Sequence, residues 1–237
     1  MVQFLYILMT FDIITIFPNI FDSYFKESII RRAQERKIVK INIRNLRDYT
    51  KDKHKTVDDK PYGGGPGMIL KVEPIFKAVK NVRIVGDVGD VKKTSLTKTI
   101  LLSAKGKKFD QKMAYRFSKL DRIILICGRY EGVDERVAQH IADEEISIGD
   151  YILTGGELPA MIVVDAISRL MPGVIKEDSL REETFSFKNK REKLEIKIEK
   201  EYPQYTRPEV FRGWRTPKTL LSGNHKKIEE WKKKHRG

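Results

Sequence analysis

Runs of continuously apolar residues alternate with stretches of helical character over the first 170 residues, and this alternation constrains the fold more than any other feature. The apolar runs predict β-strands at 11–17, 38–43, 98–103, 122–127 and 144–149. The stretches between and after them predict helices at 19–35, 72–80, 107–119, 133–140 and 157–170. Strands that are apolar throughout are typical of a parallel sheet covered by helices on both faces. The sequence therefore predicts an α/β domain.

The alternation stops at MPGV, residues 171–174. The acidic and polar stretch that follows has no clear period, which is typical of a linker. Beyond it, residues 188–201 alternate in charge at helical spacing, and residues 224–235 predict a basic helix with Asn224 as its N-cap. We therefore expect a core domain over residues 1–172, a linker over 173–187 and a small helical domain over 188–237.

The chain is strongly basic, and the excess charge is concentrated near its C-terminus. Lys and Arg number 47 against 33 Asp and Glu, which gives a net charge of +14. Residues 186–237 alone contain 16 Lys and Arg against seven Asp and Glu. An excess of this size attracts a polyanion, usually a nucleic acid, although a solvated basic surface is the alternative. We expect the C-terminal domain to bind nucleic acid.

The cysteine content and the N-terminus bear on the compartment. Cys127 is the single cysteine, so an intramolecular disulfide is excluded and a structural zinc site is not expected. A reducing cytoplasm is the default for such a chain. The apolar residues 1–17 have the hydrophobicity of a signal peptide, but they lack a basic start and a small-residue cleavage site and contain Asp12. We expect a buried strand there and no membrane partner.

Four segments carry most of the glycines that a ligand site would need. They are PYGGGPGM (61–68), LLSAKGKKFDQ (101–111), CGRYEGVDERV (127–137) and SIGDYILTGGELPA (147–160). The last three each accompany or follow a predicted strand, and ligands of open α/β sheets bind beyond the carboxyl ends of the strands. Each segment alone could be no more than a tight turn. The three segments together predict loops that wrap one small molecule.

Two familiar nucleotide-binding patterns do not account for these glycines. The sequence contains no GxxxxGK[ST], so ATP hydrolysis at a P-loop is not expected. The segment IVGDVGDV (84–91) has the look of a dinucleotide-binding loop, but it lacks a third glycine and a helical signal after it. We interpret that segment as a turn.

In this order the segments resemble those of the bacterial tRNA (guanine-N1)-methyltransferase family, TrmD. DKHKTVDDKPYGGGPGM (52–68), YTRPEVFRG (205–213) and LLSGNH (220–225) belong to the same resemblance. It spans about residues 11 to 236, with a gap near 82–97. The first eight to ten residues precede the usual start of the family, so both Met1 and Met9 remain candidate start positions.

The resemblance implies the fold, the reaction and the partners. Family members are SPOUT-class enzymes, in which an α/β domain is tied in a deep trefoil knot. They transfer a methyl group from S-adenosylmethionine to N1 of the guanosine at tRNA position 37, beside the anticodon. They act as homodimers in which the partner chain completes each active site. A cytoplasmic enzyme that binds the anticodon arm of tRNA, and not DNA, is therefore expected.

The resemblance also assigns site residues. Positions that match contacts to S-adenosylmethionine are Leu102, Ser103, Ala104, Gly128, Ile148, Gly149, Asp150, Tyr151, Ile152, Leu153, Gly155, Gly156 and Pro159. For the apolar members, packing in the core is the alternative. His54 either contacts RNA or is a polar loop residue. Magnesium takes part in the family's reaction and is possible here, but no residues have the spacing of a dedicated metal cage, so we assign no metal ligands.

The chemistry requires a base and a cation in addition to the methyl donor. Guanine N1 carries a proton at neutral pH, and its removal leaves negative charge on the base. Arg169 matches the catalytic arginine of the family. The base is an aspartate in most members, but here the matching linker position is Glu183, one methylene longer. Asp178 is the alternative base if the linker aligns differently.

Three other functions remain as alternatives. A knotted enzyme that methylates a different RNA position would lack the C-terminal match of residues 205–225. An RNA-binding module without catalysis would have no affinity for S-adenosylmethionine, whereas the glycine-bearing loops predict such affinity. A ribosome-associated structural protein is supported by charge alone.

Overall fold

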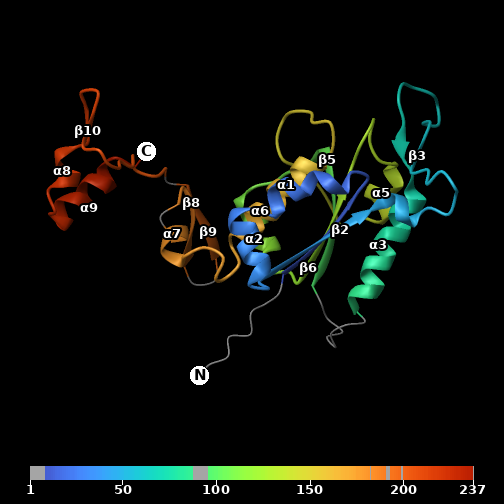
Figure 1. The fold of residues 1–237 in the computed structure, drawn as a ribbon, viewed down its shortest axis with the longest axis horizontal. Coiled ribbons are helices and arrows are strands. Elements are labelled where there is room, and N and C mark those ends of the chain that lie inside the picture. Colours follow the sequence, from blue (N-terminus) through green and yellow to red (C-terminus); the bar gives the residue numbers. More distant parts are fainter. Residues whose placement is uncertain (1–8, 88–95, 182, 191–192, 199, 237) are drawn as a thin grey trace. The chain divides into compact units, whose positions relative to one another are not determined.

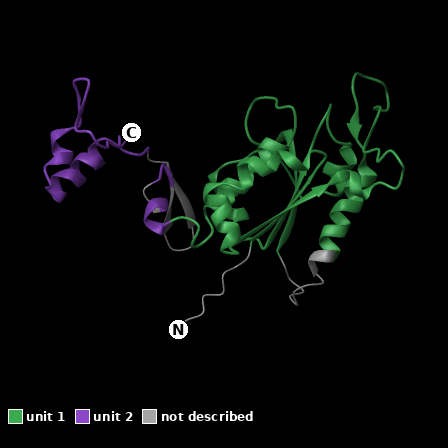
Figure 2. Cartoon of the chain, viewed as in Figure 1, with its two compact units in different colours: residues 1–175 green, residues 176–237 purple. Residues whose placement is uncertain are grey.

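The computed structural model describes residues 9–87, 96–181, 183–190, 193–198 and 200–236. The chain divides into two compact units, Met1–Ile175 and Lys176–Gly237 (Figure 2). Within these described ranges, no helix is long and apolar enough to cross a membrane.

A parallel sheet forms the centre of the first unit. Its order is β2-β1-β6-β5-β7, and every neighbouring pair within the described residues is parallel. The strands are β1 (Met9–Thr15), β2 (Val39–Asn45), β5 (Thr97–Lys108), β6 (Arg122–Cys127) and β7 (Glu144–Ser147). The prediction of an α/β fold with a parallel sheet is therefore confirmed. A short hairpin of β3 (Asp58–Asp59) and β4 (Ile69–Leu70) lies outside this sheet.

Helices cover both faces of the sheet (Figure 1). One face packs against α1 (Asp22–Phe25), α2 (Ser28–Glu35), α4 (Gln111–Phe117) and α6 (Glu157–Ser168). The other packs against the 3-10 helix η2 (Leu46–Tyr49), α3 (Val72–Asp87) and α5 (Glu135–His140). The packing of β6 explains why residues 123–127 are all apolar. Ile123 and Leu125 enter the first core, whereas Ile124 and Ile126 enter the second.

Several predicted helix bounds in the first unit were wrong. The helix expected at 19–35 is divided into a 3-10 turn, η1 (Pro18–Phe21), and the helices α1 and α2. The helix expected from residue 107 begins at Gln111, because β5 continues to Lys108 and Asp110 caps the helix by accepting from Met113 N. The prediction of a turn at 84–91 is also wrong for residues 84–87, because α3 continues to Asp87. Residues 88–91 lie outside the described residues.

The second unit combines short helices with two β-hairpins. Its helices are α7 (Glu177–Arg181), α8 (Lys218–Leu221) and α9 (His225–Lys234). The prediction of a helix at 188–201 was wrong. β8 (Phe185–Lys190) and β9 (Lys193–Ile198) pair antiparallel there, and β10 (Val210–Phe211) pairs with β11 (Trp214–Arg215). The predicted cap of the last helix is confirmed, since Asn224 Oδ1 accepts from Lys227 N at 3.1 Å.

Candidate functional site

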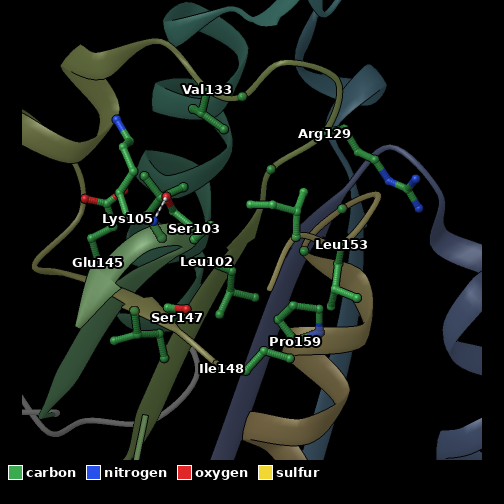
Figure 3. Close-up of a pocket in the computed structure, with 18 of the residues that line it drawn as sticks. Leu102, Ser103, Lys105, Arg129, Val133, Glu145, Ser147, Ile148, Leu153 and Pro159 are labelled. Carbon is green, nitrogen blue, oxygen red and sulfur yellow. Dashed lines mark hydrogen bonds between the residues drawn. The ribbon is translucent and has the colours of Figure 1, made fainter. Parts of the chain in front are cut away.

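A cavity of about 320 Å³ opens at the carboxyl ends of β5, β6 and β7. Its walls come from the three glycine-bearing segments that accompany or follow these strands (Figure 3). The register between β5 and β7 shifts between Leu102 and Lys107, so that Ser103, Ala104 and Lys105 leave the regular ladder and line the cavity. The three loops therefore surround one small-molecule site, at the edge where α/β sheets bind ligands.

Eleven of the thirteen residues predicted to bind the small molecule line this cavity: Leu102, Ser103, Ala104, Gly128, Ile148, Tyr151, Ile152, Leu153, Gly155, Gly156 and Pro159. Gly149 and Asp150 do not line it. The Asp150 side chain is 85% exposed and pairs with Lys108. The Gly149 backbone is held by Ser147, whose Oγ donates to Gly149 O at 2.9 Å and accepts from Gly149 N at 3.2 Å.

Two of the loops meet in direct backbone contact at Gly156. Gly156 N donates to Gly128 O at 2.9 Å. A Cβ atom at Gly156 would lie 2.7 Å from Cys127 Cα and 2.9 Å from Gly128 N. Both neighbouring atoms are backbone and cannot rotate away, so any side chain at this position would push the loops apart. The glycine is therefore required by the close approach of α6 to the end of β6.

The buried carboxylate of Glu157 holds the same two loops together through hydrogen bonds. Glu157, the first residue of α6, is 1% exposed. Its Oε2 accepts from Arg129 Nε at 2.9 Å and its Oε1 from Thr15 Oγ1 at 2.8 Å. The Arg129 guanidinium also donates to Thr154 O at 3.1 Å and lies 4.7 Å above the Phe17 ring. A buried ion pair with these additional hydrogen bonds fixes the geometry of the loops around it.

Glu145 at the cavity and Cys127, which directly precedes the lining residue Gly128, differ in what they can do. The Glu145 side chain lines the cavity, and its Oε1 is buried with no hydrogen-bond partner among the residues that the structure describes (Figure 3). A buried acceptor of this kind is costly unless a ligand donates to it. Burial, and to a smaller extent the negative charge of Glu157, raises the pKa of the Cys127 thiol well above its usual value. Cys127 is therefore a packing residue and not a nucleophile.

Sequence reasoning missed several residues of the cavity wall. They include Lys105, Arg129, Tyr130, Glu131, Val133, Glu135 and Glu145. Most of them lie in the segment CGRYEGVDERV, from which only Gly128 had been assigned to the site. The segment 61–68 also reaches this end of the unit, because Glu131 N donates to Met68 O at 3.1 Å and Leu70 N donates to Gly132 O at 3.0 Å. His54 lies exposed in the loop before β3.

Comparison with known proteins identifies the family. Residues 9–237 match the family described as tRNA (Guanine-1)-methyltransferase TrmD. The chain belongs to the TrmD family. It is 52% identical over 224 residues to a tRNA (guanine-N(1)-)-methyltransferase of Dictyoglomus turgidum, covering 94% of this chain and 83% of the relative. It is equally similar, over 227 residues, to the enzyme of the same name from Carboxydothermus hydrogenoformans, covering 95% and 82%.

A solved structure agrees with this assignment. The crystal structure of tRNA (m1G37) methyltransferase from Aquifex aeolicus superimposes with a TM-score of 0.74 at 41% sequence identity. The similarity covers 96% of this chain and 88% of that one. The resemblance inferred from the sequence motifs is therefore confirmed.

The methyl donor expected of a TrmD-family protein fits the cavity in three respects. S-adenosylmethionine is cationic and carries ammonium, amino and hydroxyl donors, any of which would satisfy the buried Glu145 Oε1. The backbone approach at Gly156 and Gly128 leaves amide and carbonyl groups, and not side chains, at the cavity wall. Exposed Ile152 and Leu153 supply apolar surface for a ring.

The two residues expected to act on the base lie in different units. Arg169 directly follows α6 and keeps helical backbone angles, and its N donates to Asp165 O at 3.1 Å. Glu183 lies in a bend after α7, whereas its rival Asp178 lies within α7. Across the described ranges, no three His, Cys, Asp or Glu side chains are grouped so that they could hold a metal ion.

Proposed function

We propose that this chain transfers the methyl group of S-adenosylmethionine to N1 of the guanosine at position 37 of tRNA, beside the anticodon. The observation that carries the proposal is the cavity that the three glycine-bearing loops form together, within the region that matches the TrmD family. The family assignment and the Aquifex aeolicus m1G37 enzyme support the choice of substrate.

In this proposal the loop residues hold the donor and keep its methyl group directed at the base. When bound, the donor supplies an electrophilic methyl carbon on a sulfonium. Backbone groups of the loops 102–104 and 148–153 hold the adenosine part, while Ile152 and Leu153 flank the ring. Glu145 accepts a hydrogen bond from an N–H or O–H group of S-adenosylmethionine. The ion pair of Arg129 and Glu157 holds together the two loops that contain Gly128 and Gly156 during the transfer.

Two charged side chains act on guanine. Glu183 takes the proton from N1, so that the N1 lone pair forms the bond to the methyl carbon while the carbon–sulfur bond breaks. Arg169 stabilises the negative charge that proton removal leaves on the base. Glutamate has the same acid–base chemistry as the aspartate usual in the family, and its extra methylene extends the reach by about one C–C bond.

We infer that the active unit is a homodimer and that the domain is knotted as in other SPOUT enzymes. The outer surface of α6 supports the dimer. Leu158 and Ile162 are 55% and 45% exposed, and Arg169 follows on the same face at helical spacing. Exposed apolar side chains in a row favour burial against a second chain. A dimer interface there would place Arg169 at the boundary between the two chains.

The remaining assignments follow from charge and from the family. The basic C-terminal unit binds the anticodon arm, and the enzyme works in the cytoplasm. We assign no magnesium ligands. If the reaction depends on magnesium, as in the family, methyl transfer stops when EDTA is added and recovers when MgCl₂ is restored.

Nuclease mapping after reaction with purified protein tests the function. Transcripts with guanosine at positions 36 and 37 are incubated with S-adenosylmethionine, and we expect N1-methylguanosine at position 37 alone. A transcript with adenosine at position 37 serves as the control. Methylation at another nucleotide would replace the proposal with another RNA methyltransferase activity. RNA binding without any transfer would favour a binding module.

The assignment of the base has its own test. Glu183→Gln keeps the shape of the side chain but removes its basicity, so single-turnover transfer should fall by about 10²–10⁴-fold. Affinities for tRNA and S-adenosylmethionine should change little, because the lost interaction serves the transition state. Glu183→Asp restores the residue usual in the family and should retain substantial activity. If Asp178→Asn abolishes transfer and Glu183→Gln does not, Asp178 is the base.

A further inference from the structure

The β10–β11 hairpin presents two large aromatic side chains on one face. Its two-residue turn consists of Arg212 and Gly213, both with positive φ (49° and 87°), as a tight hairpin turn of this kind requires. Phe211 and Trp214 flank the turn as direct cross-strand partners. Their ring centroids are 5.9 Å apart with the planes inclined at 58°. The turn therefore sets the two rings side by side at the tip of the hairpin.

These rings are exposed, whereas Trp231, the other tryptophan, is half-buried. Phe211 is 54% exposed and Trp214 is 71% exposed. By contrast, Trp231 of α9 stacks on the His235 ring at a centroid distance of 4.2 Å and packs edge-on against Tyr205. Trp231 thus contributes to the packing of its unit, whereas Trp214 does not. Adjacent exposed aromatic side chains on a short hairpin are typical of a contact surface.

The charge around the rings indicates the partner. The Arg212 guanidinium lies 5.6 Å from the centre of the Phe211 ring, and Arg215 is exposed beside Trp214. Residues 200–236 contain eleven Lys and Arg against four Asp and Glu. Stacking platforms flanked by arginines bind unpaired nucleotides, because the rings stack on bases while the guanidinium groups pair with phosphates. A protein partner with an apolar surface would not need this positive charge.

We propose that the β10–β11 hairpin contacts single-stranded nucleotides of the RNA substrate, with a base stacked on Trp214 or Phe211 and with Arg212 and Arg215 on the phosphates. The proposal rests on the proposed function, since it assigns to this hairpin part of the contact with tRNA. It adds a defined element, and a mode of recognition by stacking, to an interface otherwise inferred from charge.

Tryptophan fluorescence tests the contact directly. The sequence contains two tryptophans, so Trp231→Phe leaves Trp214 as the single emitter while it keeps a ring against Tyr205 and His235. We expect tRNA to quench or shift the Trp214 emission, with a midpoint equal to the Kd measured by filter binding. Emission that stays constant while the same protein binds and methylates tRNA would overturn the proposal and leave the proposed function intact.

Substitutions in the wild-type background separate stacking from charge. Trp214→Leu and Phe211→Leu keep an apolar side chain, and each should weaken tRNA affinity about tenfold without changing the salt dependence. Arg212→Gln with Arg215→Gln should reduce the slope of log affinity against log salt by about 0.7 per lost phosphate contact. The control is Phe76→Leu on α3, a 52% exposed phenylalanine of the first unit, which should leave affinity unchanged.

Three further outcomes would count against the proposal. If Trp214 emission depends on protein concentration without RNA, the hairpin packs against a second copy of the chain. If Trp214→Leu and the Phe76→Leu control bind tRNA as tightly as the wild type, the hairpin makes no contact. If the wild-type protein neither binds nor methylates any tRNA, the proposed function fails as well. This result comes from the wild type alone, so it is distinguishable from a failure that only the hairpin variants reveal.

Discussion

At the scale of single residues, the candidate site depends on backbone atoms that lie too close together to admit a side chain. Glycines in three loops were recognisable in the sequence, and eleven of the residues that the family resemblance assigned in these loops line one cavity. The direction of individual side chains was not predictable. Asp150 follows the same strand as the lining residues but extends into solvent toward Lys108. The partners of Glu157 were also hidden, because Thr15 and Arg129 are 142 and 28 positions away in sequence.

We predict that Gly156→Ala weakens the binding of S-adenosylmethionine far more than Gly128→Ala does. A Cβ at Gly156 would lie 2.7 Å from the backbone of Cys127, whereas a Cβ at Gly128 would lie 3.3 Å from a Val133 methyl group. The methyl group can shift, but the backbone cannot without moving a loop. A displacement of about 1 Å can cost ~10²-fold in activity. Titration calorimetry measures both affinities, and thermal melting checks that both variants fold. Equal affinities would show that this contact does not shape the site.

At the scale of secondary structure, the sequence predicted elements whose hydrophobic period is clear and missed those where two signals compete. Every strand of the main sheet was expected, because each lies in a recognisable apolar run, although only β1, β5 and β6 place apolar side chains in both cores. Residues 185–198 combine helix-like charge alternation with apolar residues at every second position (Phe185 and Phe187, then Leu194, Ile196 and Ile198), and the strand period prevails. The helix expected from residue 107 starts later, because a pairing of Lys107 and Lys108 with β7 extends β5.

An ion pair that ties three elements together should make stability depend on pH. Arg116 of α4 and Lys98 of β5 both bond to Glu144 of β7, and these hydrogen bonds, with Arg116 contributing most, lower the pKa of Glu144 from 4.5 to about 2. A carboxyl whose pKa is lower in the folded state stabilises the fold above pH 4.5, and this contribution is lost as the pH falls toward 2.

We predict that Glu144→Gln lowers the free energy of unfolding at pH 7 by about 1–2 kcal/mol. The full pKa shift would correspond to about 3 kcal/mol at about 1.4 kcal/mol per unit, but solvent screens the half-exposed Arg116. Urea denaturation should show the difference from wild type at pH 7 and its decrease at pH 3. Glu73→Gln, which removes an exposed pair with Lys77 on α3, is the control and should leave stability nearly unchanged. A difference independent of pH would exclude the ion pair as its cause.

At the scale of the whole molecule, the residues expected to act on guanine are divided between the two units. Arg169 directly follows α6 in the first unit, and Glu183 belongs to the second. The sequence placed both residues by resemblance, but no periodicity or spacing within one chain could tell whether they meet within a protomer or between protomers. The exposed row of Leu158 and Ile162, on the face of α6 that Arg169 continues, favours an interface at this point. We therefore expect Arg169 of one protomer to act with Glu183 of the other.

Mixed dimers with distinct affinity tags test this arrangement in two reciprocal combinations. In the first, an Arg169→Ala chain is paired with a Glu183→Gln chain. If the residues act across the interface, one site contains both changes and the other contains neither, so the dimer should keep about half of wild-type single-turnover activity. In the second, a chain with both changes is paired with a wild-type chain, and each site then contains one change, so activity should be lost. Action within one protomer requires the opposite result in both mixtures, because each site would then be built from a single chain. The two homodimers of the singly changed chains are the controls, and both should be inactive under either arrangement. A fully active monomer at nanomolar concentration would contradict the dimer itself.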